Sequence, residues 1–142
     1  MNVETSSISY FRYNRDNGPL TSREIAESQG VNCQWVVHAF YKEHLGVELP
    51  KDLLSRELFQ DNELFITIDP REELRTGDII IVSRTQHAKM ENFHLAVCVD
   101  DQRILHATSF DKKVSIWLTS DLFKRYPLVW AVKRMKPESV EI

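Results

Sequence analysis

The order of two hydrophobic periodicities along the chain constrains its fold more than any other feature of the sequence. Between Asn32 and His44, apolar side chains recur every three or four residues, which places them on one face of a helix. After Glu63 the pattern changes to short β-rich runs that are separated by turn residues. Helices therefore come first and strands follow, without the strand-helix alternation of parallel sheets. This order predicts an α+β fold, with N-terminal helices packed on an antiparallel β-sheet.

Capping and turn residues predict where these elements begin and end. Thr21 and Glu24 have the spacing of a capping box, which predicts the start of a short first helix. Asn32 is the expected N-cap of the second helix, and Gly46 is placed to end it. The expected elements are a first helix to about 29, strands at 64–68, 78–83, 93–99, 103–108, 114–118 and 128–133, a hairpin turn at 100–101, and a short helix at 120–124.

The composition excludes several classes of function. The 142 residues contain no repeat and no linker, so we expect one domain over 1–142. The four glycines are isolated, which excludes a glycine-rich phosphate loop, and the two cysteines, Cys33 and Cys98, cannot form a C-x-x-C metal site. A formal net charge of −3 lacks the excess of Lys and Arg that nucleic-acid binding needs. We therefore expect no cofactor, no metal and no nucleic-acid partner.

The N-terminal residues set the expected location of the protein. Residues 1–9 have neither the basic start nor the apolar run of a signal peptide, and no stretch approaches the ~18 apolar residues of a membrane span. We therefore expect a cytoplasmic location and no membrane partner. Export by a dedicated secretion system stays open, as does the oligomeric state.

Cys33 is the candidate nucleophile because it falls in the first turn of the second predicted helix. The partial positive charge and free amides of a helix N-terminus favour thiolate over thiol, and the same amides can stabilise an oxyanion. Cys98 falls within a β-rich run, so we expect it in the core.

His94 and His106 are the candidate partners of this cysteine. They lie on two successive predicted strands, and a turn at 100–101 would place them opposite each other, with Cβ atoms about 5 Å apart. One ring would serve as the base and the other would orient it. The remaining histidines, at positions 38, 44 and 87, are expected to be structural or exposed.

Four segments in this order resemble a known family. They are the helix start at 32–37 with its end at 45–50, the Gly-Asp turn at 74–79, and the strands at 94–97 and 104–107. Together they are similar to the NlpC-type cysteine peptidases, papain-like enzymes that cleave amide bonds in bacterial cell-wall peptides. The resemblance implies a papain-like fold, with Cys33 as nucleophile and His94 as general base. It also implies that His106 holds the His94 ring and that the Cys33 amide joins an oxyanion hole.

The chain departs from the family pattern beside the nucleophile. The family usually has Asp before the cysteine and small residues after it, whereas this chain has Asn32 before it and Gln34-Trp35 after it. We expect Gln34 and Trp35 to line the substrate groove, and we expect the tryptophans at 117 and 130 in the core. Members of the family often have a tyrosine upstream of the nucleophile that contributes to the oxyanion or substrate site. In this chain Tyr10 and Tyr13 are the two candidates for it.

Three hypotheses for function follow. The first is a cysteine hydrolase that cleaves a peptide amide in bacterial cell-wall stem peptides. The second is an acyltransferase or thioesterase with the same nucleophile and base, which only the identity of the acyl acceptor would distinguish. The third is a degenerate domain that binds without catalysis, in which Cys33 would react like an ordinary thiol.

Overall fold

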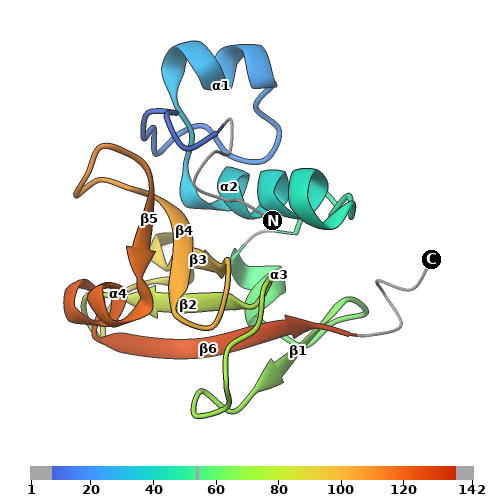
Figure 1. The fold of residues 1–142 in the computed structure, drawn as a ribbon, viewed down its shortest axis with the longest axis vertical. Coiled ribbons are helices and arrows are strands. Elements are labelled where there is room, and N and C mark those ends of the chain that lie inside the picture. Colours follow the sequence, from blue (N-terminus) through green and yellow to red (C-terminus); the bar gives the residue numbers. More distant parts are fainter. Residues whose placement is uncertain (1–7, 54, 137–142) are drawn as a thin grey trace.

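The computed structural model describes residues 8–53 and 55–136, and in it N-terminal helices pack on a six-stranded antiparallel sheet (Figure 1). The predicted α+β fold is therefore confirmed. The helical elements are α1 (Arg23–Gln29), α2 (Cys33–Phe40), the π-helical turn η2 (Tyr41–Leu45), α3 (Ser55–Phe59), the 3-10 turn η3 (Met90–Asn92) and α4 (Thr119–Arg125). The strands are β1 (Phe65–Ile68), β2 (Ile79–Ser83), β3 (His94–Cys98), β4 (Arg103–Thr108), β5 (Lys113–Leu118) and β6 (Leu128–Met135).

The sheet has the order β1-β6-β2-β3-β4-β5, and all of its neighbours are antiparallel. The last strand, β6, therefore inserts between β1 and β2 and pairs with both. β2 is buried at every position, as its run Ile79–Ser83 of four consecutive β-branched residues and a serine indicates for a strand covered on both faces. Among the described residues, no helix has the length and apolar character needed to cross a membrane.

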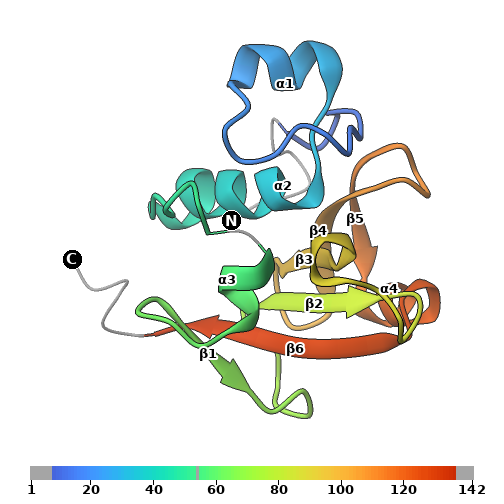
Figure 2. The same cartoon turned by 180° about the vertical axis from the view of Figure 1, so that it is seen from behind.

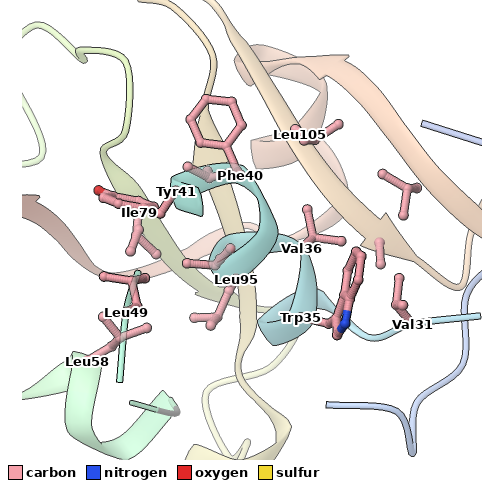
Figure 3. Packing of buried hydrophobic residues seen from close by; sticks show 14 of the residues in the cluster. Val31, Trp35, Val36, Phe40, Tyr41, Leu49, Leu58, Ile79, Leu95 and Leu105 are labelled. Atoms are coloured by element: carbon pink, nitrogen blue, oxygen red, sulfur yellow. The ribbon is translucent and has the colours of Figure 1, made fainter. Parts of the chain in front are cut away.

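The helices cover the sheet from two sides. Figures 1 and 2 show α2 between the sheet and α1, which lies farther from the strands, whereas α4 lies near the end of the sheet where β6 begins. The larger apolar cluster packs α2 residues such as Val36 and Phe40 against Leu95 and Leu105 of the sheet (Figure 3). A smaller cluster on the opposite side includes Cys98, which is fully buried as predicted.

The helix boundaries follow the sequence with two differences. Ser22, not Thr21, is the N-cap of α1, because its hydroxyl accepts the N–H of Ile25 at 3.3 Å. The second helix leaves α-helical geometry after Phe40 and continues as the π-helical turn η2 before it ends at Gly46, which has φ +68°. The short helix α3 is a further difference, since no helix was predicted there.

Two tryptophans are less buried than expected. Trp130 is 37% exposed, stacks on Phe93 and donates its indole N–H to Ser83 at 2.7 Å. Trp117 is partly buried and donates its indole N–H to Asp111 at 2.7 Å. Alternation with apolar neighbours indicated buried rings, but both indoles lie near strand ends where polar partners reach their N–H groups.

Candidate active site

Cys33 is the first residue of α2. Asn32 caps this helix as predicted, and its side-chain oxygen accepts the N–H of Trp35 at 3.0 Å. The backbone amide of Leu95 from β3 lies near enough to the Cys33 sulfur to lower the pKa of the thiol, as do the amides of Cys33 itself and of Gln34. The helix start therefore brings the thiol to the strand position that follows His94.

Burial sets the protonation of this thiol. It raises the pKa of Cys33 above its ordinary value, while the amides of Leu95, Cys33 and Gln34 act in the opposite direction. The position of Cys33 at a helix N-terminus, taken alone, predicts that the thiolate is favoured. The desolvation of a charged sulfur outweighs the attraction of the helix amides, so the resting group is the neutral thiol.

The two predicted histidines meet in the structure. His94 Nε2 and His106 Nδ1 lie 2.7 Å apart and form a hydrogen bond, and the two ring centroids are 4.9 Å apart. His94 is partly buried at the start of β3, whereas His106 is completely buried in β4. The alternation of side chains along the strands predicted this meeting correctly, because it placed both rings on one face of the sheet.

The predicted register of the β3-β4 hairpin was wrong by two residues. Its turn covers three residues, since Val99 donates to the carbonyl of Arg103 at 2.9 Å and the carboxylate of Asp100 accepts two amides of the turn. Val97 consequently pairs with Leu105, and His94 and His106 are not directly opposite. A shift of two residues keeps every side chain on its face, so the two rings still meet diagonally.

The two strands stop pairing just where the site lies. Within the described part of the chain, β3 pairs with β4 only through Val97–Leu105 and Cys98–Ile104. Beyond this point the amide of Leu95 approaches the Cys33 sulfur instead. The thiol from the helix layer therefore approaches β3 at Leu95, the residue next to His94.

Both histidines are held in their neutral form. Burial lowers the pKa of His94, and burial, together with the repulsion that a protonated His94 would exert, lowers the pKa of His106. Neutral imidazoles have one donor and one acceptor nitrogen each, so a single proton lies between the two rings.

Two aromatic residues that sequence reasoning missed hold the histidine rings. Tyr126 stacks on His94 with centroids 4.4 Å apart and an interplanar angle of 8°. Trp117 contacts His106 in a T-shaped arrangement at 4.3 Å and 76°. Pairing of β4 with β5 puts Trp117 opposite Ile104, on the face of His106, so strand alternation contained a signal for it. Tyr126 follows α4, and no local pattern indicates its position.

Phe110 extends this aromatic cluster toward solvent. Its ring packs at the edge of Tyr126, and the guanidinium groups of Arg84 and Arg125 lie 5.2 and 5.1 Å from its centroid. Trp117 also lines two surface hollows. One, of about 310 Å³, includes Asp111, Asp121, Lys124 and Arg125, and a larger one of about 530 Å³ follows the outer strand β5.

The two candidate upstream tyrosines occupy different surroundings. Tyr10 is 60% exposed and packs its ring against the edge of Phe11. Tyr13 is partly buried, and burial raises the pKa of its phenol, with Cys33 and Tyr126 acting in the same direction. Tyr13 therefore lies near enough to Cys33 to interact with it electrostatically.

Gln34 and Trp35, expected in the substrate groove, lie in different surroundings. Gln34 is partly buried at the helix start, where its backbone amide acts to lower the pKa of Cys33. Trp35 is only 6% exposed, packs against Phe11 and donates its indole N–H to the carbonyl of Thr21 at 3.0 Å. Most of the Trp35 ring thus serves the packing of α2, and only its margin faces a small hollow behind the helix.

The other histidines lie away from this cluster. His38 is buried, and its Nε2 bonds the carbonyl of Leu53 at 3.0 Å. His44 packs against Phe40, and His87 is exposed. Over residues 8–53 and 55–136, no group of three or more His, Cys, Asp or Glu side chains is arranged to hold a metal ion.

Comparisons with known proteins bear on the family and on the fold. The model of the family described as NlpC/P60 matches residues 18–133. Among solved structures, the chain is similar to the P60 domain of an antigen from M. avium subspecies paratuberculosis, with 18% identity and a TM-score of 0.51. That match covers 94% of this chain and 84% of the other, and it supports the papain-like fold. A comparison with curated proteins gives no match.

Proposed function

Because the chain belongs to the NlpC/P60 family, whose members are generally cell-wall peptidases, we propose that it is a cysteine peptidase that uses Cys33, His94 and His106. The proposed substrate is a peptide amide in a bacterial cell-wall stem peptide. The reaction as proposed uses no cofactor.

One observation carries this proposal. His94, the first residue of β3, forms a 2.7 Å hydrogen bond with His106. The amide of the next residue, Leu95, approaches the Cys33 sulfur. A thiol, a neutral imidazole and a second group that orients the imidazole are the parts that nucleophilic catalysis by cysteine requires.

The proposed reaction begins with attack of Cys33 Sγ on the carbonyl carbon of the scissile amide. The thiol proton passes to Nδ1 of His94, since Nε2 is already engaged with His106. The amides at the start of α2 favour the negative charge on the carbonyl oxygen. Collapse of this intermediate breaks the C–N bond, and His94 returns the proton to the leaving amine. Water then attacks the thioester, gives a proton to His94, and restores the thiol as the acid product leaves.

The neutral state of the site bears on the timing of proton transfer. Burial raises the pKa of Cys33 and lowers that of His94, so both shifts disfavour a resting thiolate–imidazolium pair. In the proposed mechanism His94 therefore removes the proton as the sulfur attacks, and the imidazolium that forms is stabilised by its hydrogen bond to His106.

The test uses purified cell-wall material and soluble stem peptides, with products identified by mass spectrometry. We expect the wild-type protein to release new amine and carboxyl ends, and Cys33→Ala to lose this activity by at least about 10⁴-fold while it stays folded. Cys98→Ala is the matched control, because Cys98 is fully buried on the other side of the sheet. It should retain activity.

Other outcomes would redirect or reject the proposal. Turnover by Cys33→Ala at the wild-type rate would reject Cys33 as the nucleophile. A product in which an added amine or alcohol replaces water as acyl acceptor would indicate an acyltransferase. Trapping of the acyl group on Cys33, followed by its identification, distinguishes these cases.

A further inference from the structure

The hydrogen bond between the histidines constrains where their protons lie. His94 must present an unprotonated Nδ1 if it is to accept the proton of Cys33, so its own proton sits on Nε2. This Nε2–H then donates across the 2.7 Å contact to Nδ1 of His106. With Nδ1 as acceptor, the neutral ring of His106 carries its proton on Nε2.

The second nitrogen of His106 is buried without a polar partner. Of the side chains that the structure describes, none forms a hydrogen bond with His106 Nε2, and His106 is 0% exposed. Ser115 is its neighbour across the β4-β5 pairing, but the Ser115 hydroxyl is itself buried and bonds no partner. An unpaired N–H in this position would cost free energy and favour the other tautomer.

The indole of Trp117 is the group that His106 does contact. The two centroids are 4.3 Å apart at 76°, a T-shaped arrangement in which the edge of one ring faces the plane of the other. The face of an indole carries partial negative charge and accepts N–H donors. The Trp117 ring is fixed by its own N–H, which donates to Asp111 at 2.7 Å.

We propose that Trp117 is a positioning residue whose indole face accepts the Nε2–H of His106 and so selects the tautomer that leaves His94 Nδ1 free to act as base. This inference rests on the proposed function, because it assigns the tautomer from the need for a base. Trp117 acts through two rings in series, His106 and then His94.

The tautomers can be measured without substrate. We would label the histidine rings of the full chain with ¹⁵N and record long-range ¹H–¹⁵N spectra at pH 7. We expect His94 and His106 both to carry the proton on Nε2, with the His106 Nε2–H resonance shifted upfield by the indole ring current. A proton on Nδ1 of His106, or a downfield Nε2–H signal typical of a bond to oxygen, would overturn the inference.

Variants separate the indole face from mere packing. In Trp117→Leu we expect His106 to change or average its tautomer and kcat to fall at least about tenfold at unchanged KM, because a buried donor is left unpaired. Trp117→Phe keeps an aromatic face and should restore both the tautomer and most of kcat. Ser115→Ala is the control and should leave the tautomer unchanged.

These outcomes keep the two proposals apart. A change of tautomer in Ser115→Ala but not in Trp117→Leu would overturn the role of Trp117. If Trp117→Leu does not fold, the wild-type spectrum and Trp117→Phe still decide. Expected tautomers in a protein that cleaves no peptide would reject only the proposed function, whereas peptide cleavage with His106 protonated on Nδ1 would reject only this inference.

Discussion

At the scale of single residues, burial decides the charge of each reacting group. Desolvation raises the pKa of the Cys33 thiol and lowers that of the His94 imidazole. The helix amides that favour a thiolate are present, but their effect is smaller. The free protein is therefore expected to hold an unreactive thiol until a substrate is attacked.

The pH dependence of alkylation tests this protonation state. Because the pKa of Cys33 is raised, its thiolate fraction at pH 7 is below that of an ordinary cysteine, and its rate with iodoacetamide should keep rising beyond pH 9. Alkylation of the intact protein, located by peptide mass spectrometry, gives the rate at Cys33. A plateau below pH 7 that disappears in His94→Ala would contradict this, since it indicates a thiolate–imidazolium pair.

The residues of the site differ in how far sequence could predict them. Cys33 at a helix start and the shared face of His94 and His106 follow from local periodicity, which is why the sequence indicated them. Tyr126 reaches His94 through the placement of α4 against the sheet. A contact of this kind depends on tertiary packing, and no spacing within the chain encodes it.

At the scale of elements, one glycine holds the start of α2 in place. Gly30 has φ +94°, and a Cβ there would lie 2.6 Å from the carbonyl oxygen of Arg12. This carbonyl accepts the amide of Val31 at 2.8 Å, so the clash would displace the segment that precedes the Cys33 helix.

Substitution of the two helix-end glycines should therefore have unequal effects. Gly30→Ala is expected to lower the free energy of unfolding by about 2–4 kcal/mol, from positive φ and a backbone clash together. Gly46→Ala also meets positive φ, +68°, but open space, and is expected to cost about 1 kcal/mol. Urea unfolding of both variants measures the difference, and equal losses would contradict the backbone contact at Gly30.

A buried lysine ties β6 to β1 and to the segment that precedes β1. Lys133 is 0% exposed, and its ammonium donates to Asp61 at 2.7 Å, to Thr67 at 2.6 Å and to the carbonyl of Phe59 at 3.2 Å. Hydrogen bonds from Lys133 and Thr67 lower the pKa of Asp61 to about 2, so this pair persists in weak acid.

Removal of either partner of this pair should have different effects on stability. Asp61→Asn leaves a buried ammonium without its anion, whereas Lys133→Met replaces the charge by an apolar chain of similar length. We expect Asp61→Asn to be the more destabilising of the two in urea unfolding. The reverse order would mean that the ammonium is solvated well enough without the carboxylate.

At the scale of the whole molecule, buried histidines make stability depend on pH. Burial lowers the pKa values of His38, His94 and His106 from an ordinary value of 6.5. The unfolded chain then binds protons that the folded protein does not. The stability contributed by neutral histidines is complete above pH 6.5 and is lost as the pH falls below it.

Acid titration of the unfolding free energy tests this dependence. Each such histidine is expected to contribute a slope of up to about 1.4 kcal/mol per pH unit below pH 6.5. In His38→Gln, where an amide can still donate to the Leu53 carbonyl, the slope should fall by about one such contribution. The exposed His87→Gln is the control for loss of a histidine. An unchanged slope in His38→Gln would contradict the prediction.

The order of helices and strands was enough to predict the α+β class, because helices that all precede the strands cannot form the alternating units of a parallel sheet. The position of β6 between β1 and β2 was beyond such reasoning, since these pairings join residues far apart in the chain. The turn covers residues 100–102 and not 100–101, because the Asp100 side chain accepts the amides of Gln102 and Arg103. The Asp100-Asp101 pair in the sequence does not indicate this side-chain cap.

The early end of the β3-β4 pairing has a further consequence for local motion. Beyond the two β3-β4 residue pairs that the structure describes, a hydrogen bond between His94 and His106 joins the strands. Protonation of both rings would turn two complementary nitrogens into two donors that face each other, and this contact would be lost. Amide hydrogen exchange at the end of the hairpin would then accelerate in acid before the rest of the sheet opens, so that the chemical state of the site controls how firmly two strands are held together.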